Sequence, residues 1–404
     1  MDDSRHQYTM SPHKPPNEIL ADADWSKRDK SITFRKLMHL DRHHLMPDVF
    51  LSTSAAYPPT PTTRTYGGHV FAQAAWAAAH TVPYGQHVHS ITGWFLLLGD
   101  TRYAFEYRVR RIRDGGIYAL RLVEAYQDSA AADDAKTPTF TAVISFKRDE
   151  RNKHKPGAKG QRRDFEHQEL PRDWLQQEYG QLLQRKQRFE DWPVTQGMDG
   201  MWSPELTVDE WKRRGDAFPG LDMRKVNMDG YNSKACLGAV DDGGQAARRW
   251  KLLLMYRLVP DSEEERRTVQ ERHKHKNGAD DVINLHICAH LYASDRNSLF
   301  LAQRALGFEK VGGHVGSLSH TVNIHGYGSD LLMVEDGTGR LRDFTQESWT
   351  SNSGADRVTH NSRIWDETGR IVASTVQDGM MRIQMGEKKG LVDYEAILRR
   401  ESKL

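Results

Sequence analysis

Three polar residues in the second half of this 404-residue chain stand in otherwise apolar surroundings. Asp295 lies where a mostly apolar helix gives way to the next helical segment, Ser317 begins the following strand, and Gln377 interrupts the apolar alternation of the last strand. An acid, a hydroxyl and an amide are enough to bind and deprotonate a water, with the acid as general base. Backbone N–H groups at a helix start can stabilise a developing oxyanion. The three residue types therefore suggest hydrolysis, provided that the fold brings them together.

Each of the three residues also has an ordinary structural alternative. Asp295 can be the N-cap of a helix over residues 296–306, and Ser317 can be a turn residue. Gln377 can be an exposed strand residue. Spacing alone does not choose between these alternatives and catalysis, because the choice depends on whether the strand and helix ends converge.

The elements that must position these residues begin with a helix in the first half. A Gly67-Gly68 turn opens an alanine-rich stretch that is apolar on nearly every face, which predicts a buried helix to Ala79. A hairpin turn is predicted at residues 113–116 within an antiparallel meander. The strands of this meander are expected at residues 87–98, 104–112, 117–127 and 139–147.

The same layout recurs from about residue 216 to 390. It comprises a strand, a charged loop, an apolar helix and three strands, over residues 250–258, 261–281, 282–293, 316–324, 357–365 and 371–382. Turn 113–116 with its following strand matches Gly354 with strand 357–365, and segment 139–146 matches 371–379. This internal duplication of a helix-plus-meander unit predicts an α+β fold that occurs twice.

The duplication divides the chain into five parts. They are a polar leader (1–30), a first unit (31–150), a charged linker or insertion (151–215), a second unit with the candidate catalytic residues (216–390) and a tail (391–404). The basic run 147–163 is interpreted as solvated linker, because acidic residues interrupt it and no aromatic residues alternate with it for base stacking.

Composition excludes several classes of protein. The net charge of +2 gives no field that would drive the chain onto nucleic acid or an anionic membrane. No apolar stretch is long enough to span a bilayer, and two cysteines, Cys236 and Cys288, are too few for a disulfide scaffold. We therefore expect a soluble intracellular protein.

Metal and cofactor chemistry are not expected. His286 and His290 have the i, i+4 spacing of half a zinc site, but the Glu of H-E-x-x-H is absent, so packed helix histidines are predicted. The chain also contains no G-x-S-x-G elbow, which argues against a serine hydrolase.

Several motifs, in order along the chain, resemble those of the acyl-CoA thioesterase II family. The most specific are Tyr292-Ala293-Ser294-Asp295 and the strand from Ala373 to Arg382. Further matches are Tyr66 to Ala74, Val88-His89-Ser90 with Phe95, Gly99 and Asp100, Arg113-Asp114-Gly115, and Phe165 to Gln168. The resemblance implies a double hotdog fold, in which two sheets each wrap a central helix. It also implies hydrolysis of acyl-CoA thioesters to free fatty acid and CoA, without a cofactor.

The resemblance also implies the catalytic set, which is an Asp, a Ser or Thr, and a Gln. By motif these fall on Asp295, Ser317 and Gln377, while Ser319, two residues further along the same strand face, is the alternative hydroxyl. Asp295 would take a proton from a water held by the other two, and the water would attack the thioester carbonyl.

The chain departs from the family pattern at several positions. The family's Gln in the opening block is His69, a second His is Thr92, and an Arg-Pro pair is Leu97-Leu98. The middle insertion and the charged loops at 261–281 and 335–348 are long. These departures bear on acyl preference and oligomeric contacts and leave the three catalytic candidates untouched.

The last residues, Ser402-Lys403-Leu404, form a receptor-read peroxisomal address. We therefore expect a peroxisomal protein of fatty-acid metabolism, with acyl-CoA and a peroxisomal import receptor as partners and no nucleic acid. We also expect a homo-oligomer, whose subunit number the sequence does not give.

Two other functions compete with hydrolysis. The first is a hotdog protein that binds acyl-CoA without turnover; it would require a lost base, whereas Asp295 is present. The second is a hotdog hydratase or dehydratase, which by family resemblance pairs Asp with a His on the central helix. His286 is the only candidate for that histidine.

Overall fold

A computed structural model describes part of the chain. The described residues are 19–20, 23, 32–58, 63–127, 137–150, 166–183, 188–194, 218–236, 249–259, 282–296, 298–305, 313–335 and 338–383. Nearly all of the predicted leader, most of the linker, the loop 261–281 and the tail with Ser402-Lys403-Leu404 lie outside the described residues.

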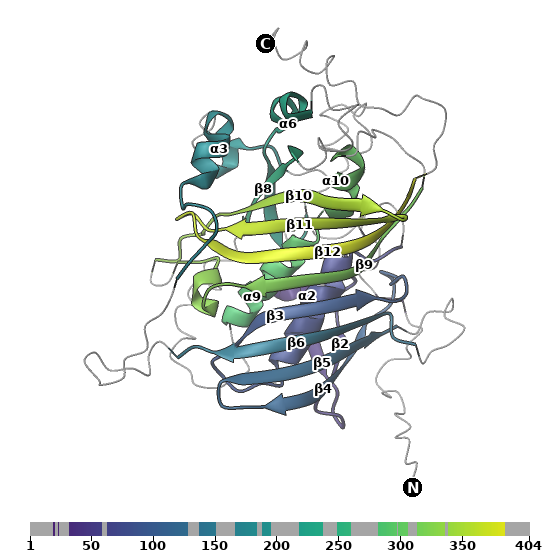
Figure 1. Ribbon diagram of the computed structural model, residues 1–404. Helices are drawn as coiled ribbons and strands as arrows, with labels where there is room; N and C mark the ends of the chain where they lie inside the picture. The colour runs from purple at the N-terminus through teal and green to yellow at the C-terminus, as the bar shows by residue number, and fades with distance from the viewer. Residues whose placement is uncertain are drawn as a thin grey trace, which may run out of the picture.

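Twelve antiparallel strands form one continuous sheet (Figure 1). The strands of the first half are β1 (Leu40–Arg42), β2 (Val49–Ser52), β3 (Gln86–Phe95), β4 (Glu106–Asp114), β5 (Tyr118–Tyr126) and β6 (Phe140–Arg148). Those of the second half are β7 (Leu221–Lys225), β8 (Leu252–Leu258), β9 (Gly313–Ile324), β10 (Phe344–Gly354), β11 (Arg357–Trp365) and β12 (Ile371–Ile383).

The strand order shows the duplication. It runs β1-β2-β4-β5-β6-β3 through the first half and then β9-β12-β11-β10-β8-β7, so the second half repeats the first in reverse order. The two halves join where β3 pairs with β9. Register shifts recur at equivalent places, at His89 and Leu318 in the joining strands and at Ile112 and Ser351 in β4 and β10. The predicted α+β fold, occurring twice, is confirmed.

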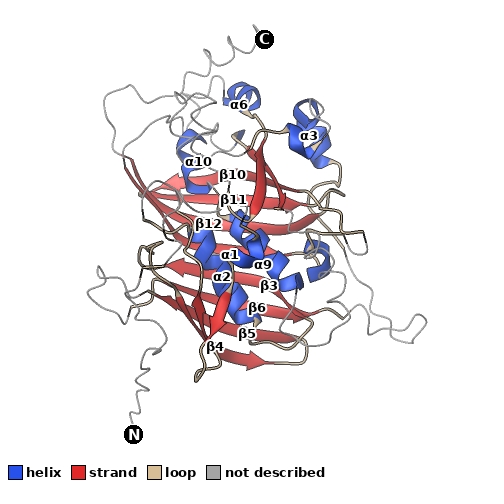
Figure 2. Cartoon of the chain, turned by 180° about the vertical axis from the view of Figure 1, so that it is seen from behind, coloured by secondary structure: helices blue, strands red, loops and turns tan. Residues whose placement is uncertain are grey.

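Two central helices lie side by side on one face of this sheet (Figure 2). They are α2 (Gly67–Ala79) and α9 (Val282–Ser294), and in α2 every residue from Gly68 to Ala79 is buried. Their positions agree with the predicted buried helices, since a helix that is apolar all round must be enclosed. The other helices are α1 (Phe34–Leu37), α3 (Trp174–Leu183), α6 (Asp229–Cys236), α10 (Ser298–Ala305) and the 3₁₀ turns η2 (Phe189–Asp191) and η5 (Gly328–Leu331).

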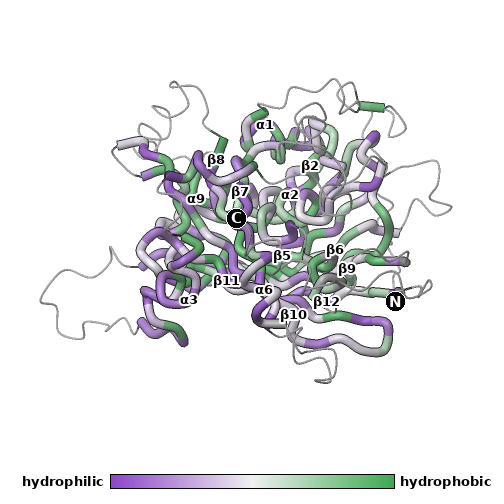
Figure 3. Tube along the Cα trace, turned by 90° about the horizontal axis from the view of Figure 1, so that it is seen from above, coloured by the Kyte–Doolittle hydropathy of each residue, from purple (hydrophilic) through white to green (hydrophobic). Residues whose placement is uncertain are grey.

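A buried carboxylate attaches α3 to the sheet. Glu347 on β10 is 1% exposed and accepts hydrogen bonds from the hydroxyl of Tyr179 (2.8 Å) and the indoles of Trp174 and Trp365 (3.3 Å each). A guanidinium nitrogen of Arg363 lies 3.5 Å from it. The outer side of α3 is mostly hydrophilic (Figure 3). Helix α3, which belongs to the insertion, is thus attached to the second repeat through the buried Glu347 carboxylate and its hydrogen-bond donors.

The turn between β11 and β12 receives the start of the insertion. Gln168 donates to the carbonyl of Gly369 (3.1 Å) and accepts from the backbone N–H of Ile371 (3.1 Å). Gly369 has φ +76°, and a Cβ there would collide with the carbonyl of Arg172, so only glycine fits.

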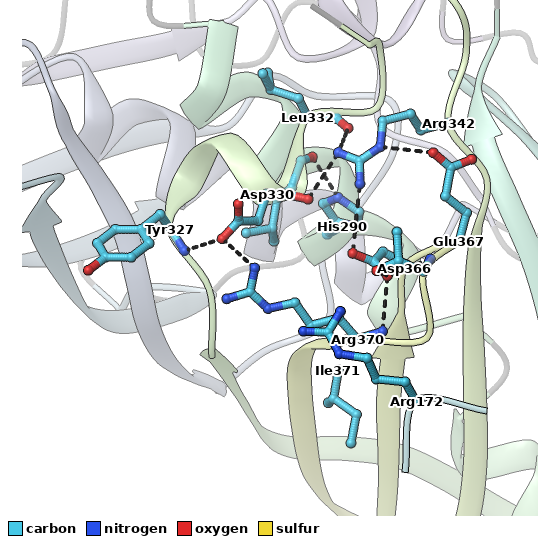
Figure 4. Close-up of polar contacts among 12 residues, drawn as sticks. Arg172, His290, Tyr327, Asp330, Leu332, Arg342, Asp366, Glu367, Arg370 and Ile371 are labelled. Atoms are coloured by element: carbon cyan, nitrogen blue, oxygen red, sulfur yellow. Dashed lines mark hydrogen bonds and ion pairs between the residues drawn. The ribbon is translucent and has the colours of Figure 1, made fainter. Parts of the chain in front are cut away.

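Charged side chains fix the segment after β9 to the same turn (Figure 4). Asp330 accepts from the backbone N–H of Tyr327 (2.8 Å) and from Arg370 (3.0 Å). Arg342 donates to the carbonyl of Leu332 (2.9 Å) and lies 3.8 Å from Asp366. These contacts connect the segment after β9 to the turn between β11 and β12.

Four of the described strands, β1, β2, β7 and β10, were not predicted from the sequence, and β10 lies partly where a loop was expected. Part of the predicted charged loop 335–348 is the start of β10, which pairs with β8 and β11. The residues of β10 that face the helices include Gln346, Ser348 and Thr350, which are polar although they are buried. Without apolar alternation, the usual signal of a strand is missing.

Candidate active site

The fold brings the three candidate residues into contact. The side-chain nitrogen of Gln377 on β12 donates to Asp295 Oδ1 (2.5 Å) and to Ser317 Oγ (2.7 Å). Gln377 is completely buried and Asp295 is 8% exposed. The amide therefore uses both of its N–H bonds to hold the acid and the hydroxyl at one point. Gln377 is not an exposed strand residue.

Asp295 follows the end of a central helix. α9 ends at Ser294 and α10 begins at Ser298, so Asp295 lies in the turn between them. The backbone N–H of Arg296 donates to the carbonyl of Ala293 within this turn. The position differs from the N-cap alternative, in which the helix begins at residue 296.

A β-bulge separates Ser317 from Ser319. Gly379 pairs with Ser317 and Asp378 pairs with Ser319, so Leu318 is the extra residue of β9. Ser317 therefore faces the helices, whereas Ser319 pairs with Trp94, whose side chain is 43% exposed on the other face. The expectation that both serines share a strand face was wrong, because a bulge shifts the alternation by one residue.

The first repeat supplies the other wall of the site. A methyl group on Gly67, the first residue of α2, would lie 2.8 Å from Asp295 Oδ2 and 3.1 Å from the ring of Phe95. No acidic residue occupies the first turn of α2, and its N-cap residue Tyr66 makes no side-chain capping bond. The start of α2, which is the positive end of the helix dipole, thus lies beside the carboxylate.

A hydrogen bond from Tyr66, the N-cap residue of α2, connects the two central helices beside the site. Its hydroxyl donates to the carbonyl of Tyr292 on α9 (2.6 Å). Burial, and then the negative charge of Asp295, raise the pKa of Tyr66 well above its usual value, so the phenol stays protonated. A Cβ on Gly68 would lie 2.7 Å from the same carbonyl, so the helices approach too closely there for any side chain.

His320 supports the residue before Asp295. Ser294 donates its hydroxyl to the carbonyl of Leu291 (2.7 Å), and its oxygen lies 2.8 Å from His320 Nε2. The serine proton is already used, so His320 Nε2–H is the donor and Nδ1 carries the lone pair. Burial lowers the pKa of His320 to about 3, which keeps the ring neutral.

The two histidines of α9 are packed residues with structural partners. His290 donates to the carbonyl of Leu331 (2.9 Å) and accepts from the hydroxyl of Tyr256 (2.8 Å). His286 Nδ1 accepts from the backbone N–H of Met333 (3.1 Å). No metal-binding cluster of His, Cys, Asp or Glu occurs among the residues that the structure describes.

The positions that depart from the family pattern have different environments. His69 is completely buried on α2, with its ring 6.2 Å from that of Tyr292. The hydroxyl of Thr92 lies 3.1 Å from that of Thr321, across the junction of the repeats. Leu97 and Leu98 are 47% and 72% exposed. Of these, only His69 lies in the core beside the site.

Sequence reasoning did not identify the histidines next to Gln377. His320 and His360 are the residues paired with Gln377 on the two neighbouring strands, and both are buried. The signal that could have found them is a polar residue at an inward position of an alternating strand. It can be read only once the bulge and the strand pairing are known.

Comparison with known proteins agrees with this architecture. The hotdog class is defined here by a sheet wrapped on a central helix, present twice. A solved hotdog-fold protein from Alicyclobacillus acidocaldarius superposes with a TM-score of 0.53 at 12% identity, over 87% of this chain and 98% of its own.

The sequence comparisons point to acyl-CoA thioesterases. Residues 56–147 match the model of the acyl-CoA thioesterase N-terminal domain. Acyl-coenzyme A thioesterase 8 of mouse is 34% identical over 117 residues, which is 28% of this chain and 37% of the mouse protein. Peroxisomal acyl-coenzyme A thioester hydrolase 1 of Saccharomyces cerevisiae is 29% identical over 102 residues, 25% of this chain and 27% of its own. The predicted relationship to acyl-CoA thioesterases is confirmed.

The matched region covers only part of these relatives. The chain spans about a third of the length of the curated relatives that it matches. Asp295, Ser317 and Gln377 lie outside the 56–147 domain match. In the described part of the chain, no helix has the length and apolar character needed to cross a membrane.

Proposed function

We propose that the protein hydrolyses acyl-CoA thioesters to a free fatty acid and CoA, with Asp295 as the general base. The observation that carries the proposal is the pair of hydrogen bonds from the Gln377 amide to Asp295 (2.5 Å) and Ser317 (2.7 Å). The names of the relatives point to the same substrate class.

The hydrogen bonds assign separate tasks to the three side chains. Both N–H bonds of Gln377 are used, so the amide holds the other two groups instead of the water. Ser317 accepts from the amide and keeps its own proton to donate. A water that accepts from Ser317 and donates to Asp295 is then oriented for attack.

The reaction balances without a covalent intermediate on the protein. Asp295 takes a proton as the water oxygen bonds to the thioester carbon, and the carbonyl oxygen becomes an oxyanion. When the oxyanion collapses, the C–S bond breaks, and the CoA thiolate takes the proton from Asp295. Thiolate is a good leaving group, so an acyl-enzyme is unnecessary.

The start of α2 is the group best suited to stabilise the oxyanion. This helix start lies beside the Asp295 carboxylate, and Gly67 and Gly68 present no side chains to obstruct a carbonyl oxygen. The hydrolytic site therefore draws its acid from the second repeat and its oxyanion donors from the first.

Release of free CoA thiol tests the proposal directly. Purified protein is mixed with acyl-CoA esters of graded chain length and a thiol-trapping dye. We expect thiol release from at least one ester and its loss, by a factor of about 10³ or more, in Asp295→Asn. Binding of the esters without any thiol release would favour the non-catalytic acyl-CoA-binding protein instead. Hydration of crotonyl-CoA would favour a hydratase. That function fits less well, because His286 Nδ1 already accepts a hydrogen bond from the backbone N–H of Met333.

We also propose a peroxisomal location. Its support is the tripeptide Ser402-Lys403-Leu404, outside the described residues, and the peroxisomal name of the yeast relative. A fluorescent protein fused to the N-terminus should enter peroxisomes, and removal of Leu404 should leave it outside. The import receptor and a homo-oligomer stay predictions, which pull-down and light scattering can test.

A further inference from the structure

A row of buried polar side chains crosses the sheet at Gln377. Thr350 on β10 pairs with His360 on β11, His360 pairs with Gln377 on β12, and Gln377 pairs with His320 on β9. All four residues are at most 3% exposed. Directly paired residues have Cβ atoms about 5 Å apart on the same face, so each side chain is within reach of the next.

The row contains polar atoms without hydrogen bonds. Gln377 Oε1, His320 Nδ1, the hydroxyl of Thr350 and both ring nitrogens of His360 have no partner among the described residues. A buried polar atom normally has one, because leaving it unpaired costs about 1–3 kcal/mol. A structural role alone gives no reason to place these atoms together.

The equivalent row of the first repeat is fully paired or apolar. Its members are Arg111, Arg121, Ile144 and Ile91, which occupy the same register positions relative to the two bulges. Arg121, the counterpart of His360, is buried and donates to the side chain and carbonyl of Thr81 (2.8 and 2.9 Å) and to Asp114 (2.5 Å). Of these two equivalent rows, only the one in the repeat that holds Asp295 thus contains buried polar atoms without a partner.

The protonation states define what these atoms can bind. Burial, and then nearby His320, lower the pKa of His360 to about 3, and burial lowers the pKa of His320 to about 3, so both rings are neutral. His320 uses its N–H on Ser294, which leaves Nδ1 as an acceptor. Gln377 Oε1 is also an acceptor, and neutral His360 has one N–H to donate. One water molecule can satisfy all three groups: its two hydrogens donate to the two acceptors, and one of its two lone pairs accepts from the donor.

We propose that His360 is a positioning residue that, together with His320, binds one buried water behind Gln377. The water donates to Gln377 Oε1 and to His320 Nδ1 and accepts from the His360 ring N–H. Thr350 is the donor available to the second ring nitrogen of His360. Because the water holds the carbonyl oxygen, the amide cannot flip, and its N–H bonds stay on Asp295 and Ser317. The effect on turnover rests on the proposed hydrolysis; the bound water does not.

Replacement of His360 by Leu separates positioning from structure. We expect kcat to fall about tenfold with KM within twofold, because the amide loses its fixed orientation. The urea midpoint should fall as well, since the bound water and Thr350 lose a hydrogen-bond partner, so kcat of the folded protein is the measurement that decides. His360→Asn, which restores a neutral donor, should recover part of kcat. An unchanged kcat in His360→Leu would overturn the proposal.

His290→Leu is the matched control. His290 is an equally buried, neutral histidine, but both of its nitrogens have partners in Tyr256 and Leu331. Its replacement should lower the urea midpoint and leave kcat of the folded protein within twofold. If His360→Leu showed this same pattern, His360 would be only structural.

An activity-independent measurement distinguishes failure of this inference from failure of the proposed function. In protein labelled with ¹⁵N-glutamine, the side-chain NH₂ of Gln377 is identified by its absence in Gln377→Met. Both of its hydrogens should exchange slowly in the wild type and at least tenfold faster in His360→Leu. A high-resolution crystal structure should show the water on all three partners. Equal exchange rates, or no water there, would overturn the proposal even for a protein that releases no CoA.

Discussion

At the scale of single residues, the contact between Gly67 and Asp295 sets how close two segments from different repeats approach. A methyl group at Gly67 would lie 2.8 Å from the Asp295 carboxylate. The neighbouring Gly68 meets a backbone carbonyl at a similar distance. The two glycines thus have different neighbours, one a side chain of the site and the other part of a helix backbone.

Gly67→Ala and Gly68→Ala should therefore differ in their effects. In Gly67→Ala the carboxylate has to move, so we expect kcat to fall about tenfold with a change in unfolding free energy below about 1 kcal/mol. In Gly68→Ala the carbonyl of Tyr292 cannot move without the helix, so we expect a loss of about 2 kcal/mol. Thiol-release kinetics and urea unfolding measure the two effects, and the reverse pattern would contradict the assignment.

At the scale of elements, the bulge at Leu318 determines which serine faces the site. Ser317→Ala should lower kcat about a hundredfold, because the water loses one of its two partners. Ser319→Ala should leave kcat within twofold, and Ser317→Thr should retain activity because it keeps the hydroxyl. A loss of activity in Ser319→Ala instead would mean that β9 has a different register.

A second element-scale prediction concerns the attachment of α3. Glu347→Leu leaves the donors of Tyr179, Trp174 and Arg363 without their acceptor in a buried position. We expect a loss of about 3–5 kcal/mol in unfolding free energy, measured by urea with tryptophan fluorescence. Glu178→Gln, on the exposed side of α3, is the control and should cost less than about 1 kcal/mol.

The elements also show which features sequence patterns can predict. Helices α2 and α9 and strand β11 were predicted to within a residue, because the helices are apolar on nearly every face and the strand alternates between more and less buried residues. β10 was missed, because its inward residues Gln346, Ser348 and Thr350 remove the alternation. Asp295, Ser317 and Gln377 were found through family motifs. Their contact, and the role of the bulge, depend on pairing between strands far apart in the sequence.

At the scale of the whole molecule, buried histidines make stability depend on pH. Burial lowers the pKa of His290, His320 and His360 from 6.5 to about 3. Between these values the unfolded chain binds protons that the folded chain does not, so stability falls as the pH falls. We expect the unfolding free energy to decrease below about pH 6.5 by up to ~1.4 kcal/mol per pH unit for each histidine.

Urea unfolding at pH 7 and pH 5 tests this dependence. His290→Leu should show a smaller difference between the two pH values than the wild type, since one of the three depressed groups is gone. A difference of the same size in the variant would mean that other groups are responsible. Above pH 7 the three rings are neutral in both states and should contribute no slope.

The two repeats share a fold but differ in the polar residues that they contribute to the site. The register positions of Ser317 and Gln377 are occupied in the first repeat by Val88 and Ile144, which cannot bind water. The first repeat keeps instead the glycine helix start that faces Asp295. Because both repeats lie in one chain, they are always present in equal number, and each can contribute different residues to one site. On the proposed function, we expect an isolated 56–147 domain to match the thioesterase domain model and to release no CoA thiol.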